Sequence, residues 1–346
     1  MSPRSVTGHR PNPGYTLMGA EMDPHALEVG ELLTSTFLVA EAKVGVDKRG
    51  QDYYSLSLNC QGGQPVDAKV WADNIGPPLE AGQGIEALAR VDQYMGRIQL
   101  NIQRYRVLSP GEFDVSQYVR CTEINTEEAF EIMFDWGRDE FRNPYFKRLM
   151  LEFHANSSFA RDFKTSPAAS FHHHNYMGGL IEHTLEVWNA ASKLYELYDG
   201  QLDRELLMCG AALHDVGKIK TYTLASGVSQ HTDAGNLLDH IFITASMVSN
   251  VWDRVVTKDV VGQEPEKAAR AKELLLHIIL SHHGTREWGS PVLPQTPEAL
   301  LIHFCDQVSA TMRSSLDAVA ALPEDQSWTD WVYILDERRK LFSPPA

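Results

Sequence analysis

The sequence predicts an α+β chain of two parts, an N-terminal all-β barrel followed by an all-α helical domain. From residue 29 to residue 107, apolar and polar residues alternate in short runs separated by turn signals, as in half-buried strands. Beyond residue 120, apolar residues recur every three or four positions, as in amphipathic helices. We therefore expect a flexible segment over residues 1–25, a barrel over 26–110, a helical connector over 120–165 and a helical domain over 166–341.

Individual strands of the barrel can be read from the alternation. Val66, Ala68 and Val70 take one face of a run whose other residues are polar or aromatic, and Ile98 to Ile102 repeats the pattern. Turn signals lie at residues 47–50 and 62–63. Because side chains alternate across a strand, Tyr53 is expected to face outward while its neighbour Tyr54 faces inward.

Capping residues and apolar spacing predict the helices. Asn125 precedes two glutamates, and Asn143 precedes Pro144, so each asparagine is expected to cap a helix. Further helices are predicted at about 178–198, 203–216, 235–255, 265–282 and 297–320.

The segment His214-Asp215-Val216-Gly217-Lys218 is the strongest chemical signal. Imidazoles and carboxylates without thiolates favour a catalytic divalent metal over a structural zinc. Consecutive helical residues lie about 100° apart, so His214 and Asp215 can flank one ion. Lys218 then lies on the same side of that helix, where its ammonium would meet phosphate oxygens.

These residues, with His183 and Asp306, resemble the ligand pattern of the HD-domain phosphohydrolases. The resemblance implies that His183, His214, Asp215 and Asp306 bind a first metal. It implies a second ion at the three remaining matching positions: His240, His282 and His283. The adjacent His282 and His283 cannot point the same way unless their helix ends there, and Gly284 follows at once. The alternative is that one binds metal while the other contacts the substrate phosphate. The cofactor is one or two divalent ions, with Mn as the first candidate and Fe, Co, Ni, Zn or Mg as alternatives.

Two further motifs resemble the YhaM-type 3'-5' exoribonucleases, an HD subfamily. His172-His173-His174 precedes Gly178-Gly179, and Gly284 through Ser290-Pro291 follows the second histidine pair. The resemblance covers residues 27–337 and implies hydrolysis of single-stranded RNA, with DNA as a further substrate, to nucleoside monophosphates. Asp215 and Lys218 would act in catalysis, with His173 and His174 at the substrate phosphate or behind the ligands.

The predicted barrel resembles the OB-fold of the tRNA-anticodon-binding type. Such barrels bind single strands by stacking bases on aromatic side chains, with cations along the backbone. The candidate nucleic-acid-binding residues are Tyr53, Lys69, Trp71, Tyr94 and Arg97. The alternative is that each exposed aromatic covers the edge of the barrel itself.

The net charge of the chain limits the classes of molecule that it is expected to bind. The net charge is −15, and residues 1–110 hold 10 Lys and Arg against 12 Asp and Glu, so the remaining chain carries most of the excess. Tight binding to duplex DNA, which requires a basic face, is therefore not expected. A small-molecule nucleotide or cyclic-nucleotide phosphohydrolase, and a binding protein with a structural metal, stay as alternatives. Whether the chain forms a homo-oligomer is open.

Other features are less informative. No apolar stretch is long enough to span a bilayer, and the first 20 residues lack a signal-peptide core, so a cytoplasmic protein without a membrane partner is expected. The four cysteines form no Cys-x-x-Cys pair. Glu182 and Asp239 each adjoin a candidate ligand and could orient its imidazole. Because neighbouring helical positions diverge, both are expected to be solvated acids instead.

Overall fold

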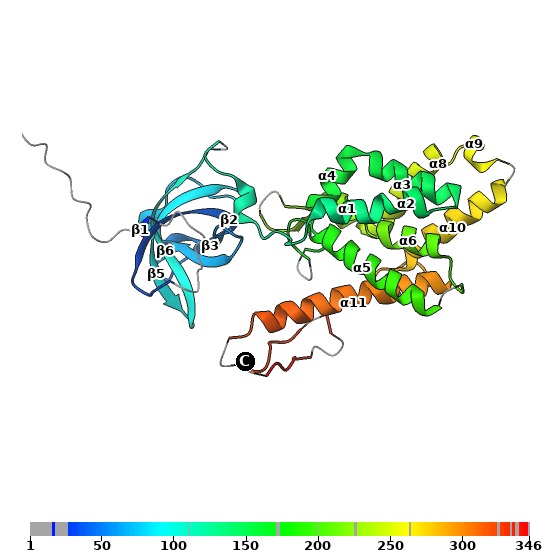
Figure 1. Ribbon diagram of the computed structural model, residues 1–346. Coiled ribbons are helices and arrows are strands. Elements are labelled where there is room, and N and C mark those ends of the chain that lie inside the picture. Colours follow the sequence, from blue (N-terminus) through cyan, green and yellow to red (C-terminus); the bar gives the residue numbers. More distant parts are fainter. Residues whose placement is uncertain are drawn as a thin grey trace, which may run out of the picture. The chain divides into compact units, whose positions relative to one another are not determined.

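The computed structural model describes residues 16–17, 27–109, 111–170, 174–198, 200–224, 227–262, 264–323, 326–332, 334–335 and 339–344. It forms two compact units (Figure 1). The barrel unit comprises Met1–Arg120 with Ala225–Gly227, and the helical unit comprises Cys121–Leu224 with Val228–Ala346. Most of the N-terminal segment predicted to be flexible lies outside the described residues. So do His172 and His173.

Five strands close the barrel. They are β2 (Leu32–Val46), β3 (Asp52–Asn59), β4 (Pro65–Val70), β5 (Gly84–Tyr94) and β6 (Arg97–Val107). Their order is β2-β3-β4-β6-β5, and β5 pairs back onto β2. The β4–β6 pair is parallel and the other four are antiparallel. This is the five-stranded Greek-key barrel of an OB-like fold, and β1 (Thr16–Leu17) adds parallel to β2.

The alternation in the sequence determines which side chains fill the barrel. Val66, Ala68 and Val70 of β4 are buried, as are Leu100 and Ile102 of β6. Two short 3-10 helices, η2 (Ala72–Asn74) and η3 (Val115–Tyr118), follow β4 and β6. The predicted all-β part of the fold class is confirmed.

The helical unit contains the predicted all-α domain, which is likewise confirmed. Its α-helices are α1 (Thr126–Phe134), α2 (Trp136–Glu140), α3 (Pro144–Ala155), α4 (Ser157–Thr165), α5 (Gly179–Tyr195), α6 (Arg204–Leu213), α7 (Lys218–Thr221), α8 (Asp233–Val255), α9 (Lys258–Val261), α10 (Pro265–Ser281) and α11 (Pro297–Ala320). The 3-10 turn η4 (Glu196–Tyr198) follows α5, and a small hairpin pairs β7 (Tyr222–Thr223) with β8 (Gln230–His231).

Local sequence explains where these helices begin. Asn125 and Asn143 accept hydrogen bonds from the first backbone amides of α1 and α3, as predicted. Asp203, Thr232 and Thr296 do the same for α6, α8 and α11. Each cap satisfies amides that have no partner within the helix.

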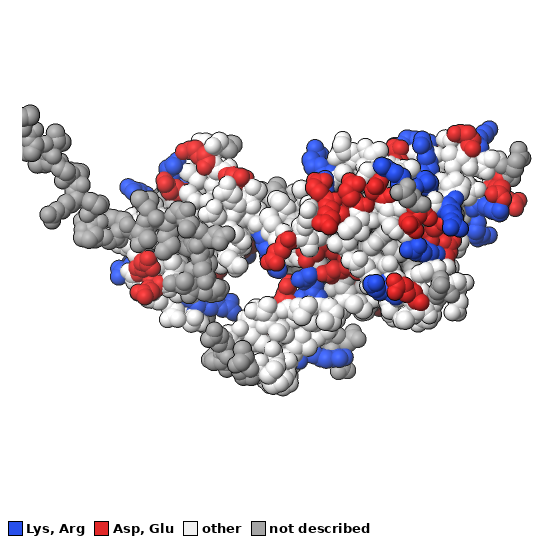
Figure 2. Space-filling view, viewed as in Figure 1, with Lys and Arg blue, Asp and Glu red and all other residues white. Residues whose placement is uncertain are grey.

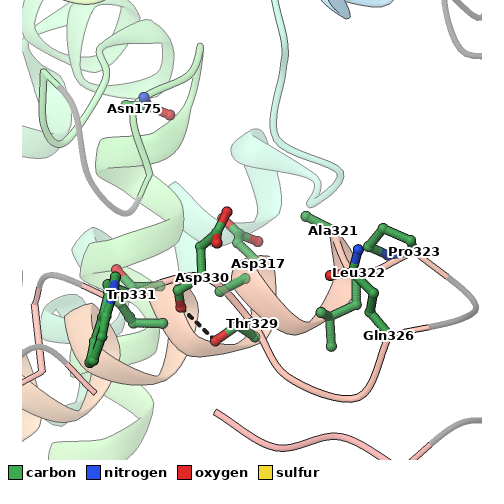
Figure 3. Close-up of a pocket in the computed structure, with 12 residues that line it drawn as sticks. Asn175, Asp317, Ala321, Leu322, Pro323, Gln326, Thr329, Asp330 and Trp331 are labelled. Atoms are coloured by element: carbon green, nitrogen blue, oxygen red, sulfur yellow. Dashed lines mark hydrogen bonds between the residues drawn. The ribbon is translucent and has the colours of Figure 1, made fainter. Parts of the chain in front are cut away.

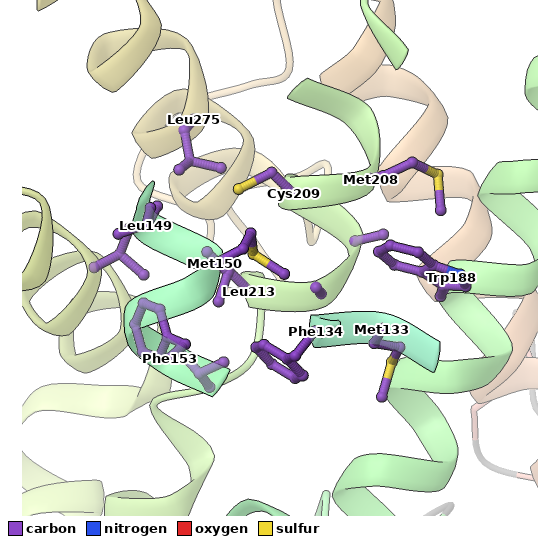
Figure 4. Close-up of a cluster of buried hydrophobic side chains, with 14 of the residues drawn as sticks. Met133, Phe134, Leu149, Met150, Phe153, Trp188, Met208, Cys209, Leu213 and Leu275 are labelled. Atoms are coloured by element: carbon purple, nitrogen blue, oxygen red, sulfur yellow. The ribbon is translucent and has the colours of Figure 1, made fainter. Parts of the chain in front are cut away.

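One core joins the helices of this unit. Figure 4 shows buried side chains of α1, α3, α5, α6 and α10 in contact around Phe134, Met150 and Leu213. The stretch predicted as a connector thus supplies side chains to the same core as α5 and α6. Among the described residues, every helix is too short or too polar to cross a membrane.

Candidate metal centre

Four predicted ligands converge in the interior of the helical unit. His183 comes from α5, His214 and Asp215 follow α6, and Asp306 comes from α11; all four are buried. His183 Nε2 lies 3.2 Å from both Asp215 Oδ2 and Asp306 Oδ1. His214 Nε2 lies 3.3 Å from His183 Nε2 and 3.3 Å from Asp215 Oδ2.

These spacings fit a common cation. At ligand distances of about 2.1 Å, donor atoms around one ion lie about 3.0 Å apart at right angles and about 3.4 Å apart in a tetrahedron. The observed separations of 3.2 and 3.3 Å fall in this interval. The residues present therefore fit a divalent metal with mixed nitrogen and oxygen ligands.

Asp215 also faces a second group of histidines. Its Oδ1 atom lies 3.5 Å from His240 Nε2 and 3.5 Å from His282 Nε2. All three atoms are buried and lack a hydrogen-bond partner among the described residues. Such groups are costly to leave unpaired, so they fit a second cation that shares Asp215 with the first.

The hydrogen bonds of the histidine Nδ1 atoms determine which ring nitrogen faces the candidate metal centre. His214 Nδ1 lies 2.9 Å from the carbonyl of Ala211, and His282 Nδ1 lies 2.7 Å from that of Ile279. A carbonyl only accepts, so each Nδ1 carries the proton and donates. The lone pair of each Nε2 is then directed at the centre, which is the tautomer a metal ligand requires.

His240 owes its position to a break in α8. Asp239, the preceding residue, has φ 60° and ψ 157° inside the helix, a region that non-glycine residues rarely occupy. Its Oδ1 atom accepts a hydrogen bond from His240 Nδ1 at 2.5 Å. The Asp239 side chain is 62% exposed, as predicted for a solvated acid. The kink also brings its carboxylate over its own neighbour, a geometry that a regular helix does not allow, so Asp239 orients the His240 ring as well.

His282 and His283 are both directed inward because α10 ends at Ser281. His283 Nδ1 donates to the Trp288 carbonyl at 2.5 Å, and its ring groups with those of His240 and His282. Gly284 follows with φ 78°, and a Cβ there would collide with His303. The helix end therefore meets the condition under which adjacent histidines serve one site.

The helix predicted over residues 203–216 ends at Leu213, so His214 is its C-cap and Asp215 lies in the following turn. Lys218, the first residue of α7, is buried, and its Nζ lies 2.6 Å from Asp215 Oδ2. Lys218 thus lies beside the candidate metal centre, as expected, and its ammonium contacts the Asp215 carboxylate. Gly217 allows this turn to approach α8, because a Cβ would clash with Thr244 and the His240 carbonyl.

Burial and ion pairs set the charges at the centre. Burial lowers the pKa of His183, but the Asp215 and Asp306 carboxylates outweigh it and raise this pKa to about 9. Burial raises the pKa of Asp215, but Lys218 and His214 outweigh it and hold it well below its usual range. The carboxylates thus favour positive charge at His183 Nε2, and a metal there would release the proton.

An outer layer that the sequence did not reveal supports His183. Its Nδ1 lies 2.9 Å from Ser309 Oγ, and Ser309 in turn donates to Glu186 at 2.6 Å. Arg313 binds both Glu186 and Glu182, at 2.7 and 2.9 Å. Glu182 is buried and also accepts from Tyr176, so its prediction as a solvated acid was wrong. Spacings of three and four residues on α5 and α11 could have indicated these pairings.

The glycine pair in the motif before α5 permits a close approach. A Cβ on Gly179 would lie 2.0 Å from the His174 carbonyl oxygen. His174 is consequently buried beside α5, with its ring centroid 5.5 Å from that of His183 and its Nε2 3.4 Å from Glu186. It lies behind the ligands. The predicted role of His173 lies outside the described residues.

On the barrel, three of the five predicted residues form one cluster. Lys69 Nζ lies 4.3 Å from the centre of the Tyr53 ring, which lies 5.2 Å from that of Trp71. Tyr94 and Arg97 pair across the β5–β6 hairpin. Tyr53 is half-buried, because Lys69 and Trp71 cover part of it, whereas Trp71 and Tyr94 are exposed.

A separate cavity of about 430 Å³ lies at the C-terminal end of α11 (Figure 3). The residues that line it come from the loop before α5, from the end of α11 and from the segment after it: Asn175, Ser314, Asp317, Ala318, Ala321, Leu322, Pro323, Gln326, Thr329, Asp330, Trp331 and Val332. None of the predicted metal ligands lines it.

Comparison with known proteins agrees with the geometry of the centre. Residues 180–311 match the family model of the HD domain. This segment contains every described residue that faces the two candidate ions, and the match indicates a metal-dependent phosphohydrolase.

Similar solved structures include a chain of a replication protein A heterotrimer bound to single-stranded DNA. It is 16% identical, with 29% of this chain and 71% of that chain covered and a TM-score of 0.20. Another is the second OB-fold domain of replication protein A from Methanococcus maripaludis, also 16% identical, with 23% and 85% covered and a TM-score of 0.18.

Proposed function

We propose that this chain is a metal-dependent 3'-5' exonuclease that hydrolyses single-stranded RNA, and single-stranded DNA as a further substrate, to nucleoside monophosphates. The observation that carries the hydrolytic part is the position of Asp215. Its two oxygens face two separate groups of imidazole nitrogens. With one divalent ion bound at each group, Asp215 would be a ligand available to both.

The two ions would be held by different residues. His183, His214, Asp215 and Asp306 form the first group, and Asp215 with His240, His282 and His283 forms the second. Bound divalent ions lower the pKa of water and stabilise charge on the attacking and leaving oxygens of a phosphoester. A mixed set of imidazole and carboxylate ligands without thiolate suits divalent first-row metals. Mn is our first candidate among them, with Fe, Co, Ni, Zn or Mg as alternatives.

The protein's own residues supply charge and orientation. Burial lowers the pKa of Lys218, but Asp215 outweighs it and raises this pKa, so Lys218 keeps its proton. Its ammonium offsets negative charge at the phosphate. The Nδ1 contacts hold each imidazole with Nε2 toward the centre, and the half-buried Glu186 and Arg313 fix the layer behind His183.

The barrel would guide the strand. In OB-folds the face of the second and third strands, with the adjoining loops, binds oligonucleotides. Here those strands are β3 and β4, which carry Tyr53 and Lys69, and Trp71 directly follows β4. The β5–β6 hairpin carries Tyr94 and Arg97. The direction of hydrolysis and the RNA preference rest on the resemblance to YhaM-type exoribonucleases.

A small-molecule nucleotide or cyclic-nucleotide phosphohydrolase is the second candidate. The net charge of −15 favours it, because a nuclease surface usually carries excess cations. In that case the barrel would regulate the helical unit.

An assay on end-labelled single strands tests the proposal. With Mn added, a 5'-labelled RNA should shorten stepwise and release nucleoside monophosphates, and a chelator should abolish the reaction. Asp215→Ala should lower turnover by about 1000-fold or more, because it removes a carboxylate shared by both groups. Near-wild-type turnover of this variant in metal-supplemented buffer would contradict the assigned centre. Hydrolysis of mononucleotides or cyclic nucleotides alone would favour the second candidate.

A further inference from the structure

The outer face of α11 carries an apolar row unlike the rest of the surface. Five large side chains, spaced four residues apart, are each between 42% and 57% exposed. They are Leu300, Phe304, Val308, Met312 and Leu316, and we call them the α11 ridge. Every position of α11 from residue 300 to its end that is classed as exposed is apolar.

The α11 ridge contains no charged residue. The charged residues of α11 are Glu298, Asp306, Arg313 and Asp317. Asp306 is buried in the metal centre, and Arg313 binds Glu182 and Glu186. In the view of Figure 2, the surface over α11 is mostly white, whereas red and blue side chains are frequent over the other helices of this unit. A solvated helix face normally carries such charges.

We propose that the α11 ridge is an interface between two copies of this chain. Residues at i, i+4 and i+8 form a ridge that packs into the matching groove of another helix, crossing it at about −50°. Such a surface is complementary to itself, as a twofold interface requires. This inference does not depend on the proposed reaction.

The charge of the chain favours a second copy, over a nucleic acid or a membrane, as the partner that covers the α11 ridge. Two chains of net charge −15 repel each other, so they approach best through a face without carboxylates. A nucleic-acid strand or an anionic membrane would need lysines or arginines beside the apolar row. The one cation of α11, Arg313, is already paired.

The apolar surface continues beyond the helix. Trp288 and Leu293, from the preceding loop, are also exposed. The Trp288 ring lies 6.5 Å from that of His303, which lies 5.2 Å from Phe304. The loop therefore adds exposed aromatic and aliphatic side chains beside the ridge.

Sedimentation of the full-length protein over a range of concentrations tests this inference. We expect the wild type to self-associate, and Val308→Glu and Met312→Glu each to weaken association by at least about tenfold. Ile132→Glu on α1 is the matched control, since Ile132 is 43% exposed and should leave association unchanged. Circular dichroism of each variant serves as the control for folding. A wild type that stays monomeric at about 100 µM, or ridge variants that associate like the wild type, would overturn the proposal.

Cysteine cross-linking identifies the contact itself. Cys121 is exposed and the other cysteines are buried, so Cys121→Ser provides the background. Val308 is the middle residue of the ridge, and a residue at a twofold axis meets itself. Val308→Cys should therefore form a covalent dimer on oxidation, while Ile132→Cys should not. Equal cross-linking at both positions, or none at residue 308, would show that the ridge has another occupant, such as this chain's own barrel unit.

Discussion

At the scale of single residues, two features shape the candidate metal centre: the position of the proton on each imidazole ring and the strained backbone of Asp239. Each ligand imidazole contacts a carbonyl, hydroxyl or carboxylate through Nδ1, so that Nε2 is left for a cation. Asp239 is the costly member of this set. Its backbone conformation is expected to destabilise the folded protein by about 1–3 kcal/mol relative to a relaxed conformation. Strain of this kind is found mainly at functional sites.

Substitutions of Asp239 separate strain from function. Asp239→Gly should raise the melting temperature of chelator-treated protein, because glycine adopts φ 60° freely. The same change should weaken the second metal about 10- to 100-fold, because His240 loses its acceptor. Asp239→Ala keeps the strain and should lower both quantities. Thermal unfolding and metal titration measure the two effects, and a Gly variant that binds two metals normally would contradict the role.

At the scale of elements, α5 and α11 are joined by polar groups behind the metal ligands. Ser309 connects His183 to Glu186, and Arg313 holds Glu186 from the next turn. Burial raises the pKa of Glu186, but His174, Ser309 and Arg313 outweigh it and hold the pKa at about 2. Glu186 is therefore ionised at neutral pH and orients the serine proton away from His183.

Ser309→Ala tests this connection. The change removes the acceptor of His183 Nδ1, so affinity for the first metal should fall about 10- to 100-fold while the helices stay folded. Ser314→Ala is the matched control on the same helix, because the Ser314 hydroxyl is buried without a hydrogen-bond partner among the described residues. Equal metal titrations for the two variants would show that Ser309 merely packs.

At the scale of the whole molecule, two units divide the work that we propose. Every described candidate metal ligand belongs to the helical unit, and every candidate base-stacking residue belongs to the barrel unit. The chain as a whole is acidic, so binding of a single strand should depend on stacking more than on released counterions.

Trp71→Ala should raise KM on long RNA while leaving turnover of a dinucleotide almost unchanged. Loss of one stacked base costs about 1–3 kcal/mol, or roughly 5- to 150-fold in affinity. Trp328→Ala, an exposed tryptophan of the helical unit, serves as the control. Equal losses on long and short substrates would make Trp71 a structural residue of the barrel.

Deleting residues 1–120 should leave a folded helical unit that binds metal and hydrolyses a chromogenic phosphodiester. Preference for long strands should disappear, because the stacking residues are removed. Circular dichroism, metal content and a comparison of short with long substrates measure these outcomes. A folded fragment without metal would show that the two units do not divide the work in this way.

Sequence alone determined the fold class and most helix positions, because periodicity is a local property, and the resemblance to the HD-domain phosphohydrolases indicated the candidate metal ligands. His183, His214, Asp215 and Asp306 could be named before any contact was known. Only the tertiary structure showed that Asp215 faces two groups of histidines, that a kink at Asp239 orients His240, and that Ser309 connects His183 to Glu186. These features depend on helices far apart in the chain packing side by side, and on a backbone conformation that residue preferences alone disfavour.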